Sequence, residues 1–263
     1  MTVLDIRGAT LRRGERELWA GLDLQVEPGE FIAVLGPSGS GKTTLLRSIL
    51  GLQPLSEGRI NVDGAPVRRG NRRIGYIPQH RHFAPDTSMR ARDVVALGVQ
   101  GTRFGLPIAR RGDREHIDSV LKDVGAAHYA DQRVGTLSGG EQQRLRVGQA
   151  LVDAPALLLC DEPLSNLDLA NQQGVTEIID RQRKERGAAV LFVTHDINPI
   201  MGKVDRILYL ARGRFMLGTP DEVLQSRVLT DLYGAPVFVL RAGDRLVVVG
   251  VPDAETHQHG DVE

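Results

Sequence analysis

The sequence is poor in several features, and each scarcity excludes a class of protein. It has one cysteine in 263 residues, Cys160, so a scaffold held by internal disulfides is excluded. Cys160 follows three leucines, and we expect a small buried core residue in a chain suited to a reducing cytoplasm. The longest apolar runs, 156–160 and 188–193, fall far short of the roughly 20 residues that a transmembrane helix needs.

An excess of one sign of charge is also missing. Lysine and arginine total 33, and aspartate and glutamate total 33. No overall basic field therefore draws the chain onto nucleic acid or anionic lipid, so we expect no nucleic-acid partner and only local partner surfaces. The opening "MTVLDIRG" has no basic segment followed by an apolar stretch, so we expect no secretory signal.

Strand-like and helical patterns alternate along the chain. A helix begins near Lys42 and should end at Gly51, which suits a left-handed cap. Within 113–124 the apolar residues recur at helical spacing until Gly125 stops them. The alternation predicts an α/β fold with a parallel sheet, and the strand-like runs are 3–11, 22–27, 31–36, 72–79, 156–161 and 188–196.

We expect a single domain over residues 1–263, with an N-terminal antiparallel β subdomain and a helical insertion in the parallel sheet. Its parts are a core of 1–79 and 154–218, a helical subdomain of 80–153, and a C-terminal segment of 219–263. That last segment should contain a helix opened by a capping box at Thr219 and Glu222, a hairpin over 237–250, and a tail. Two interpretations of His257 and His259 in the tail stay open, a loose zinc site or, favoured here, plain solvated chain.

The stretch "GPSGSGKT" fits the phosphate-loop pattern G-x-x-x-x-G-K-[ST] directly after an apolar strand and at a helix start. Its glycines let backbone N–H groups curl around phosphate oxygens, Lys42 would reach the β- and γ-phosphates, and Thr43 would offer a hydroxyl to Mg²⁺. The alternative is an ordinary Gly-Ser turn. A phosphate-loop NTPase core is therefore expected, with ATP held by Gly36, Pro37, Ser38, Gly39, Ser40, Gly41, Lys42, Thr43 and Thr44.

The stretch "LLLCDEP" delivers two carboxylates at the carboxyl end of another apolar strand. Adjacent strand residues point to opposite sides, so the two acids need not share a role. Asp161 would hold Mg²⁺ through its water shell. Glu162 would orient the attacking water and accept its proton.

The stretch "LSGGEQQRLRVG" opens a second helix over glycines. Ser138 and Glu141 form a capping box, and Gly139 and Gly140 would let an anion approach the first backbone N–H groups. One chain has one triphosphate-binding lysine loop, so this second cradle should serve a nucleotide held by another copy. The alternative is a helix that is merely well capped.

With this motif the chain closely resembles the ATPase subunits of ABC transporters, over residues 1 to about 220. The resemblance implies a homodimer in which ATP lies between the phosphate loop of one copy and "LSGGE" of the other. It also implies that Gln79 touches Mg²⁺ or the attacking water, that Asp168 lies at the dimer seam, and that His195 contacts the γ-phosphate. Taken alone, His195 would more often be a satisfied core or turn residue.

One position departs from the family's pattern. Most members place an adenine-stacking aromatic ring where this chain has Arg13. A guanidinium plane can stack on a base, so Arg13 is the predicted adenine contact. Trp19 is the nearest aromatic residue, and its setting predicts packing instead.

The resemblance further implies integral membrane permease subunits as partners, an extracytoplasmic substrate-binding protein as an indirect one, and peripheral attachment at the cytoplasmic face of the membrane. Residues 80–111 combine arginines with apolar residues, which favours a permease docking face over solvated loops. Their pattern "FAPDTSMRARDVVALG" resembles the same segment in importers of zinc and manganese, and we favour zinc. Alternatives are manganese, an iron chelate, or a soluble ABC ATPase acting on nucleic acid.

Overall fold

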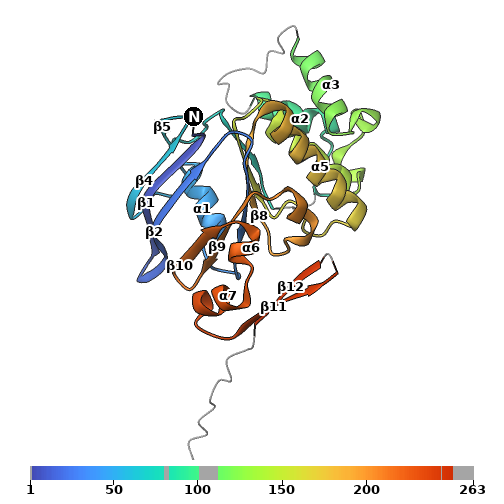
Figure 1. Ribbon diagram of the computed structural model, residues 1–263. Coiled ribbons are helices and arrows are strands. Elements are labelled where there is room, and N and C mark those ends of the chain that lie inside the picture. Colours follow the sequence, from blue (N-terminus) through green and yellow to red (C-terminus); the bar gives the residue numbers. More distant parts are fainter. Residues whose placement is uncertain (1, 80–82, 101–111, 244, 251–263) are drawn as a thin grey trace, which may run out of the picture.

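The computed structural model describes residues 2–79, 83–100, 112–243 and 245–250. A small antiparallel sheet, a larger central sheet and a group of helices follow one another across the molecule (Figure 1). None of the helices in these ranges is long and apolar enough to cross a membrane. The histidines His257 and His259 and the segment 101–111 lie outside the described residues.

The central sheet has six strands in the order β10-β9-β3-β8-β7-β6. Five of them are parallel, and β10 pairs with β9 in the antiparallel sense. The predicted parallel sheet is therefore confirmed. Its strands are β3 (Phe31–Leu35), β6 (Ile74–Ile77), β7 (Leu157–Asp161), β8 (Ala189–Val193), β9 (Arg206–Ala211) and β10 (Arg214–Gly218).

Both faces of this sheet are apolar, because a parallel sheet is covered on both sides. In β3, Phe31, Ala33 and Leu35 point into the core shared with the helices. Ile32 and Val34 point into a second core, shared with the antiparallel sheet. Cys160 is fully buried in the first core, as predicted.

The antiparallel sheet has the order β2-β1-β4-β5 and packs over α1. Trp19 is completely buried within this second core, so it packs as predicted. The elements are β1 (Leu4–Arg13), β2 (Arg16–Val26), α1 (Lys42–Ile49), β4 (Glu57–Val62) and β5 (Ala65–Pro66).

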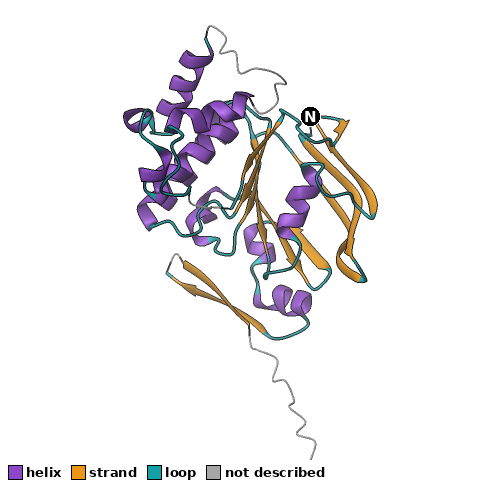
Figure 2. Cartoon of the chain, turned by 180° about the vertical axis from the view of Figure 1, so that it is seen from behind, coloured by secondary structure: helices purple, strands orange, loops and turns teal. Residues whose placement is uncertain are grey.

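The helical subdomain covers the opposite face of the central sheet (Figures 1 and 2). Val120, Leu121 and Val124 form the buried stripe that the helical spacing predicted. The elements of this subdomain are α2 (Ala91–Gln100), α3 (Asp113–Asp123), the 3-10 turns η1 (Ala127–Tyr129) and η2 (Val134–Thr136), and α4 (Gly139–Leu151). Helix α5 (Leu169–Arg186) of the core segment 154–218 packs beside α4.

The C-terminal elements lie below the central sheet in Figure 1, and the hairpin is well separated from the antiparallel sheet in both views (Figure 2). The backbone N–H of Thr219 donates to the Glu222 carboxylate at 2.8 Å, as the predicted capping box requires. These elements are α6 (Pro220–Val223), α7 (Ser226–Tyr233), β11 (Val237–Ala242) and β12 (Arg245–Gly250), while the 3-10 turn η3 (Asn198–Lys203) follows β8 in the core.

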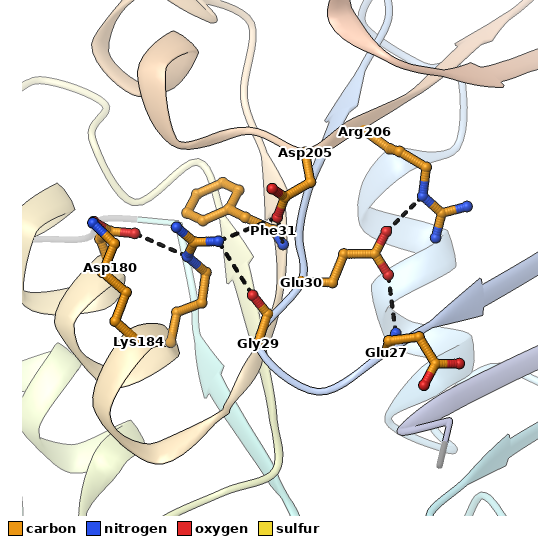
Figure 3. A network of polar contacts seen from close by, with 9 residues as sticks. Glu27, Gly29, Glu30, Phe31, Asp180, Lys184, Asp205 and Arg206 are labelled. Atoms are coloured by element: carbon orange, nitrogen blue, oxygen red, sulfur yellow. Dashed lines mark hydrogen bonds and ion pairs between the residues drawn. The ribbon is translucent and has the colours of Figure 1, made fainter.

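A polar network fixes the amino ends of β3 and β9 (Figure 3). The Asp205 carboxylate accepts from the backbone N–H of Phe31 at 2.8 Å, and Glu30 accepts from Arg206 Nε at 2.5 Å. The same edge is joined to α5 through Arg183, which donates to the Gly29 carbonyl at 3.2 Å. These contacts fix the strands at their amino ends. The loops that follow their carboxyl ends are therefore available for a site.

Candidate functional site

The phosphate loop joins the carboxyl end of β3 to α1, and its shape requires glycine. Gly36 has φ +139, and a Cβ added there would lie 2.0 Å from the Leu210 carbonyl oxygen. Gly41, with φ +97, is the N-cap of α1 and lies against Trp19. Because Gly41 has no side chain, it cannot cap the first N–H groups of the helix, which are therefore available to an anion.

Lys42 is folded back onto this loop. Its Nζ donates to the carbonyl oxygens of Gly36 at 2.7 Å and Pro37 at 2.9 Å. Burial lowers the pKa of Lys42, and the carboxylates of Glu162 and Asp161 raise it in opposition. An ammonium has three N–H donors, so one remains for a phosphate oxygen. The nearby Ser40 hydroxyl is buried without a hydrogen-bond partner in the described part of the chain, and a phosphate oxygen would satisfy it as well.

Asp161 and Thr43 meet at the predicted magnesium position. Thr43 Oγ1 donates to Asp161 Oδ1 at 3.1 Å. Hydroxyl and carboxylate oxygens are the ligands that Mg²⁺ prefers, so the residues present fit this ion, with Asp161 predicted to act through a bound water. Burial raises the pKa of Asp161, and hydrogen bonds from Thr43 and Tyr76 oppose that shift. A cation would hold the carboxylate in its charged form.

Tyr76 is a site residue that the sequence reasoning missed. Its hydroxyl lies 3.4 Å from Asp161 Oδ2, and burial together with the Asp161 charge raises the pKa of Tyr76 to about 12. Tyr76 therefore stays protonated and can only donate to the carboxylate. The contact depends on β6 lying next to β7, where Tyr76 is opposite Leu159, and no local pattern in the sequence indicated that pairing.

Glu162 gathers the remaining predicted catalytic residues. His195 Nδ1, Gln79 Nε2 and Ser165 Oγ lie 3.4, 3.3 and 3.1 Å from the same oxygen, Oε2. Glu162 has φ +46, an uncommon conformation for a residue other than glycine. Asp161 and Glu162 do face different partners, but Glu162 lies beyond the end of β7, so the turn rather than strand alternation separates them. Ser165 was not among the predicted contacts.

These groups line two neighbouring cavities. One has a volume of about 780 Å³ and is lined by Gly36, Lys42, Glu162 and His195 together with residues of the C-terminal hairpin. The second, of about 320 Å³, is lined by Gln79, Ser165, Glu162 and His195. Glu162 and His195 are thus shared by both cavities, next to the phosphate loop on one side and Gln79 on the other.

The predicted second cradle, at the start of α4, has the expected cap. Ser138 Oγ accepts from the Glu141 N–H at 3.3 Å, and Glu141 accepts from the Ser138 N–H at 2.8 Å. Gly140 is buried, and a Cβ there would lie 2.3 Å from the Asn171 side chain of α5. Gly140 therefore has a packing role that the sequence alone did not indicate. The prediction that Gly139 and Gly140 admit an anion stays a prediction.

The glutamines after the cradle also have structural partners. Gln142 Nε2 donates to the carbonyls of Val134 and Leu137, both at 3.1 Å, and its oxygen accepts from the Phe83 N–H at 3.0 Å. Gln143 Nε2 donates to the Pro163 carbonyl at 2.9 Å, directly after the Glu162 turn. Both glutamines therefore have structural roles that need no nucleotide, which agrees with the alternative of a helix that is only well capped.

Three predicted elements do not join the phosphate loop in this chain. Among the described residues, those lining the 780 Å³ cavity include none of 138–141, Arg13 or Asp168. Arg13 is exposed at the end of β1, opposite Arg16. Asp168 caps α5 by accepting from the Asn171 N–H at 2.8 Å. Their roles toward adenine and at a dimer seam remain predictions.

The predicted docking face over residues 80–111 is described only in part. Arg92 binds Asp131 at 2.7 Å and Asp118 at 3.1 Å, so this arginine is engaged within the helical subdomain. A groove lined by Pro78, Arg68, Arg72 and Arg146 among others has a volume of about 440 Å³.

Comparison with known proteins relates this geometry to one family. The family described as "ABC transporter" matches residues 19–165. A zinc import ATP-binding protein of Cereibacter sphaeroides is 35% identical over 234 residues, 89% of each chain. An aliphatic sulfonates import ATP-binding protein of Pseudomonas fluorescens is 39% identical over 224 residues, 85% of this chain and 79% of that one.

Two solved structures share the fold. An inward-facing ABC transporter assigned to the metal-chelate type has a TM-score of 0.79 and 26% identity, covering 97% of this chain and 99% of its own. A dimeric ATP-binding cassette in a post-hydrolysis state, with ADP and Pi bound, has a TM-score of 0.70 and 28% identity, covering 82% of this chain and 98% of its own.

Proposed function

This chain belongs to the ABC transporter family of ATPases, and we propose that it powers the import of a divalent metal ion through separate membrane subunits. Zinc is the first candidate for this ion. The observation that carries the proposal is the convergence of Gln79, Ser165 and His195 on one carboxylate oxygen of Glu162, beside the phosphate loop. A carboxylate held in this way can orient water and accept its proton.

The residues divide the reaction between them. Backbone N–H groups of 36–43 and Lys42 Nζ bind the phosphates of ATP, and Thr43 with Asp161 would hold Mg²⁺, which neutralises charge on the phosphate oxygens when it is bound. Glu162 orients the water and takes its proton, while His195 contacts the γ-phosphate.

A second copy of this chain completes the site. The capped start of α4 presents N–H groups that suit an anion, yet it does not line the cavity around Lys42 among the described residues. A symmetric pair would place each cradle over the nucleotide of the other copy. The solved dimeric cassette with ADP and Pi supports the formation of a dimer. The dimer would attach to its permease at the cytoplasmic face of the membrane.

The assignment of zinc rests on the segment "FAPDTSMRARDVVALG" and on the zinc import relative. Sequence identity alone does not select the cargo, since the sulfonates import relative is more identical over a shorter stretch. A metal chelate is the second candidate. The metal-chelate structure covers all but 3% of the chain, so its likeness extends into residues 219–263.

The test is uptake of radioactive zinc, manganese and a ferric chelate by cells lacking this chain. The cells carry the natural chain, Glu162→Gln, or Glu185→Gln, a control with the same chemical change on the exposed surface of α5. We expect zinc uptake to return with the natural chain and the control only. Return of ferric chelate uptake alone would favour the second candidate. If the natural chain hydrolyses ATP but restores uptake of none of the three cargoes, the metal assignment is rejected and the ATPase assignment stands.

A further inference from the structure

The side chain of Asn198 joins the loop that carries His195 to the C-terminal hairpin. Asn198 Oδ1 accepts from the backbone N–H of Leu246 at 2.7 Å, and Asn198 Nδ2 donates to the Leu246 carbonyl at 2.9 Å. Both backbone groups of Leu246 are therefore bonded by one amide, which acts here like a neighbouring strand on β12. The two residues are 48 positions apart in the sequence.

The loop between β8 and Asn198 is braced at each step. Thr194 Oγ1 donates to the Asp196 carbonyl at 2.8 Å and accepts from the Asp196 N–H at 3.1 Å. Asp196 Oδ1 then accepts from the backbone N–H and the Nδ2 of Asn198, at 2.9 and 2.7 Å. His195 lies inside this series of hydrogen bonds, so a shift of Asn198 is transmitted to the backbone that carries the imidazole.

The hairpin needs such contacts because an isolated two-stranded hairpin is marginally stable in water. Strand β11 is held to α7, where Val239 N–H donates to Ser226 Oγ at 2.9 Å and Val237 N–H to Thr230 Oγ1 at 3.0 Å. Strand β12 is held by Asn198. Val237 and Leu246 are buried and line the same 780 Å³ cavity as Lys42, Glu162 and His195. The hairpin is therefore one wall of the nucleotide cavity.

We propose that Asn198 is a positioning residue for ATP hydrolysis, which clamps the C-terminal hairpin to the loop of His195 and so makes the hydrolysis rate depend on the hairpin. This inference rests on the proposed ATPase function and adds the C-terminal segment to the parts that set its rate. Asn198 acts through His195, whose imidazole is 3.4 Å from Glu162, while Lys42 and the phosphate loop bind nucleotide independently of it.

The test compares purified full-length chains carrying Asn198→Ala or Asn198→Asp. The control Arg241→Ala removes the 2.9 Å contact between the hairpin and Asp221 but leaves the loop of His195 intact. We expect Asn198→Ala to lower kcat about tenfold, the equivalent of one well-placed hydrogen bond, with the KM for ATP within about twofold of the natural value. Asn198→Asp has the same shape but cannot donate to Leu246 and adds a charge beside Asp196, so it should lose as much.

Hydrogen exchange of the Leu246 amide reports the clamp directly. We expect faster exchange in Asn198→Ala, which removes the acceptor of this N–H, and natural protection in Arg241→Ala. Unchanged kcat in Asn198→Ala despite faster exchange would overturn the inference and leave the ATPase standing. Natural kcat in Asn198→Asp would also overturn it, because the rate would then not depend on the amide donor that bonds Leu246 and Asp196. Absence of ATP turnover in the natural chain would overturn the proposed function and this inference together.

Discussion

The imidazole Nδ1 of His195 lies 3.4 Å from Oε2 of Glu162, although the two residues follow different strands of the central sheet. Strands β7 and β8 are parallel neighbours, so their carboxyl ends meet at one edge. Gln79 and Ser165 contact the same oxygen. We therefore expect the other carboxylate oxygen, Oε1, to receive the proton of the attacking water.

Replacing Glu162 should separate nucleotide binding from hydrolysis. Glu162→Gln keeps the size of the side chain but cannot accept a proton, so turnover should fall at least about 100-fold while ATP still binds. The ATP-bound dimer should then accumulate, which light scattering at saturating ATP detects as a doubled mass. Glu185→Gln should show natural turnover. A Glu162→Gln chain that stays monomeric would contradict the two-copy site.

Replacing Lys42 should remove nucleotide binding itself. Lys42→Ala removes the ammonium group that hydrogen bonds to the loop carbonyls hold in place for the phosphates of ATP. ATP turnover should therefore disappear. Titration with a fluorescent ATP analogue should show affinity reduced by at least about tenfold. The control is Lys184→Ala, which alters an exposed lysine paired with Asp180 on α5. Natural turnover in Lys42→Ala would refute the phosphate role.

Asp161→Asn should stabilise the nucleotide-free chain while impairing hydrolysis. Burial raises the pKa of Asp161, so its contribution to stability is present at low pH and is lost as the pH rises through the folded-state pKa. Near neutral pH the neutral amide avoids that loss, and we expect the Tm to rise by about 2 °C or more.

Thermal denaturation at about pH 7.5 and about pH 4.5 tests the sign of this effect. The advantage of Asp161→Asn should shrink at the lower pH, where a larger fraction of the natural carboxyl is protonated. Mg²⁺-dependent turnover should be lost at both. An advantage that grew on acidification would show that the carboxylate is stabilised by its neighbours rather than penalised by burial.

The sequence predicted the parts of the site that follow local rules. The phosphate loop and the cap at Ser138 each depend on a few neighbouring residues, and both have the expected local geometry. The alternating run 237–250 likewise predicted the hairpin. These patterns are readable because their hydrogen bonds close within a single turn or strand pair.

Contacts between distant segments were not predictable in the same way. Tyr76 reaches Asp161 across 85 positions, and Asn198 reaches Leu246 across 48. Each contact depends on which strands become neighbours and on how a hairpin packs, and no local pattern in the chain fixes either. The packing of Gly140 against Asn171 is a further case, since its motif indicated only an anion cradle.

Gly36→Ala should destabilise the chain more than Gly39→Ala does. Both glycines have positive φ, so both alanines bear a backbone cost of about 1–2 kcal/mol. At Gly36 the new Cβ would also lie 2.0 Å from the Leu210 carbonyl, whereas nothing lies within 4 Å at Gly39. We expect an additional loss of at least about 2 kcal/mol in the free energy of unfolding, measured by urea titration. Equal losses would show that the loop can move away from β9.

The last prediction separates the two roles of Gly140. A Cβ at this position would lie 2.3 Å from the side chain of Asn171, which bonds the Asp168 carboxylate with both its backbone N–H and its Nδ2, each at 2.8 Å. Gly140→Ala should therefore displace Asn171, loosen the cap of α5 and cost about 1–2 kcal/mol in the free energy of unfolding.

The double variant Gly140→Ala, Asn171→Ala resolves the question. Removal of the Asn171 side chain opens the space that the new methyl group needs, so the two losses in stability should be less than additive. If Gly140 serves packing alone, ATP turnover should recover with stability. If the methyl group also blocks the approach of a phosphate held by the second copy, turnover should stay low although stability has recovered. We expect this second result, because Ser138 and Glu141 cap the helix without using the remaining N–H groups of its first turn.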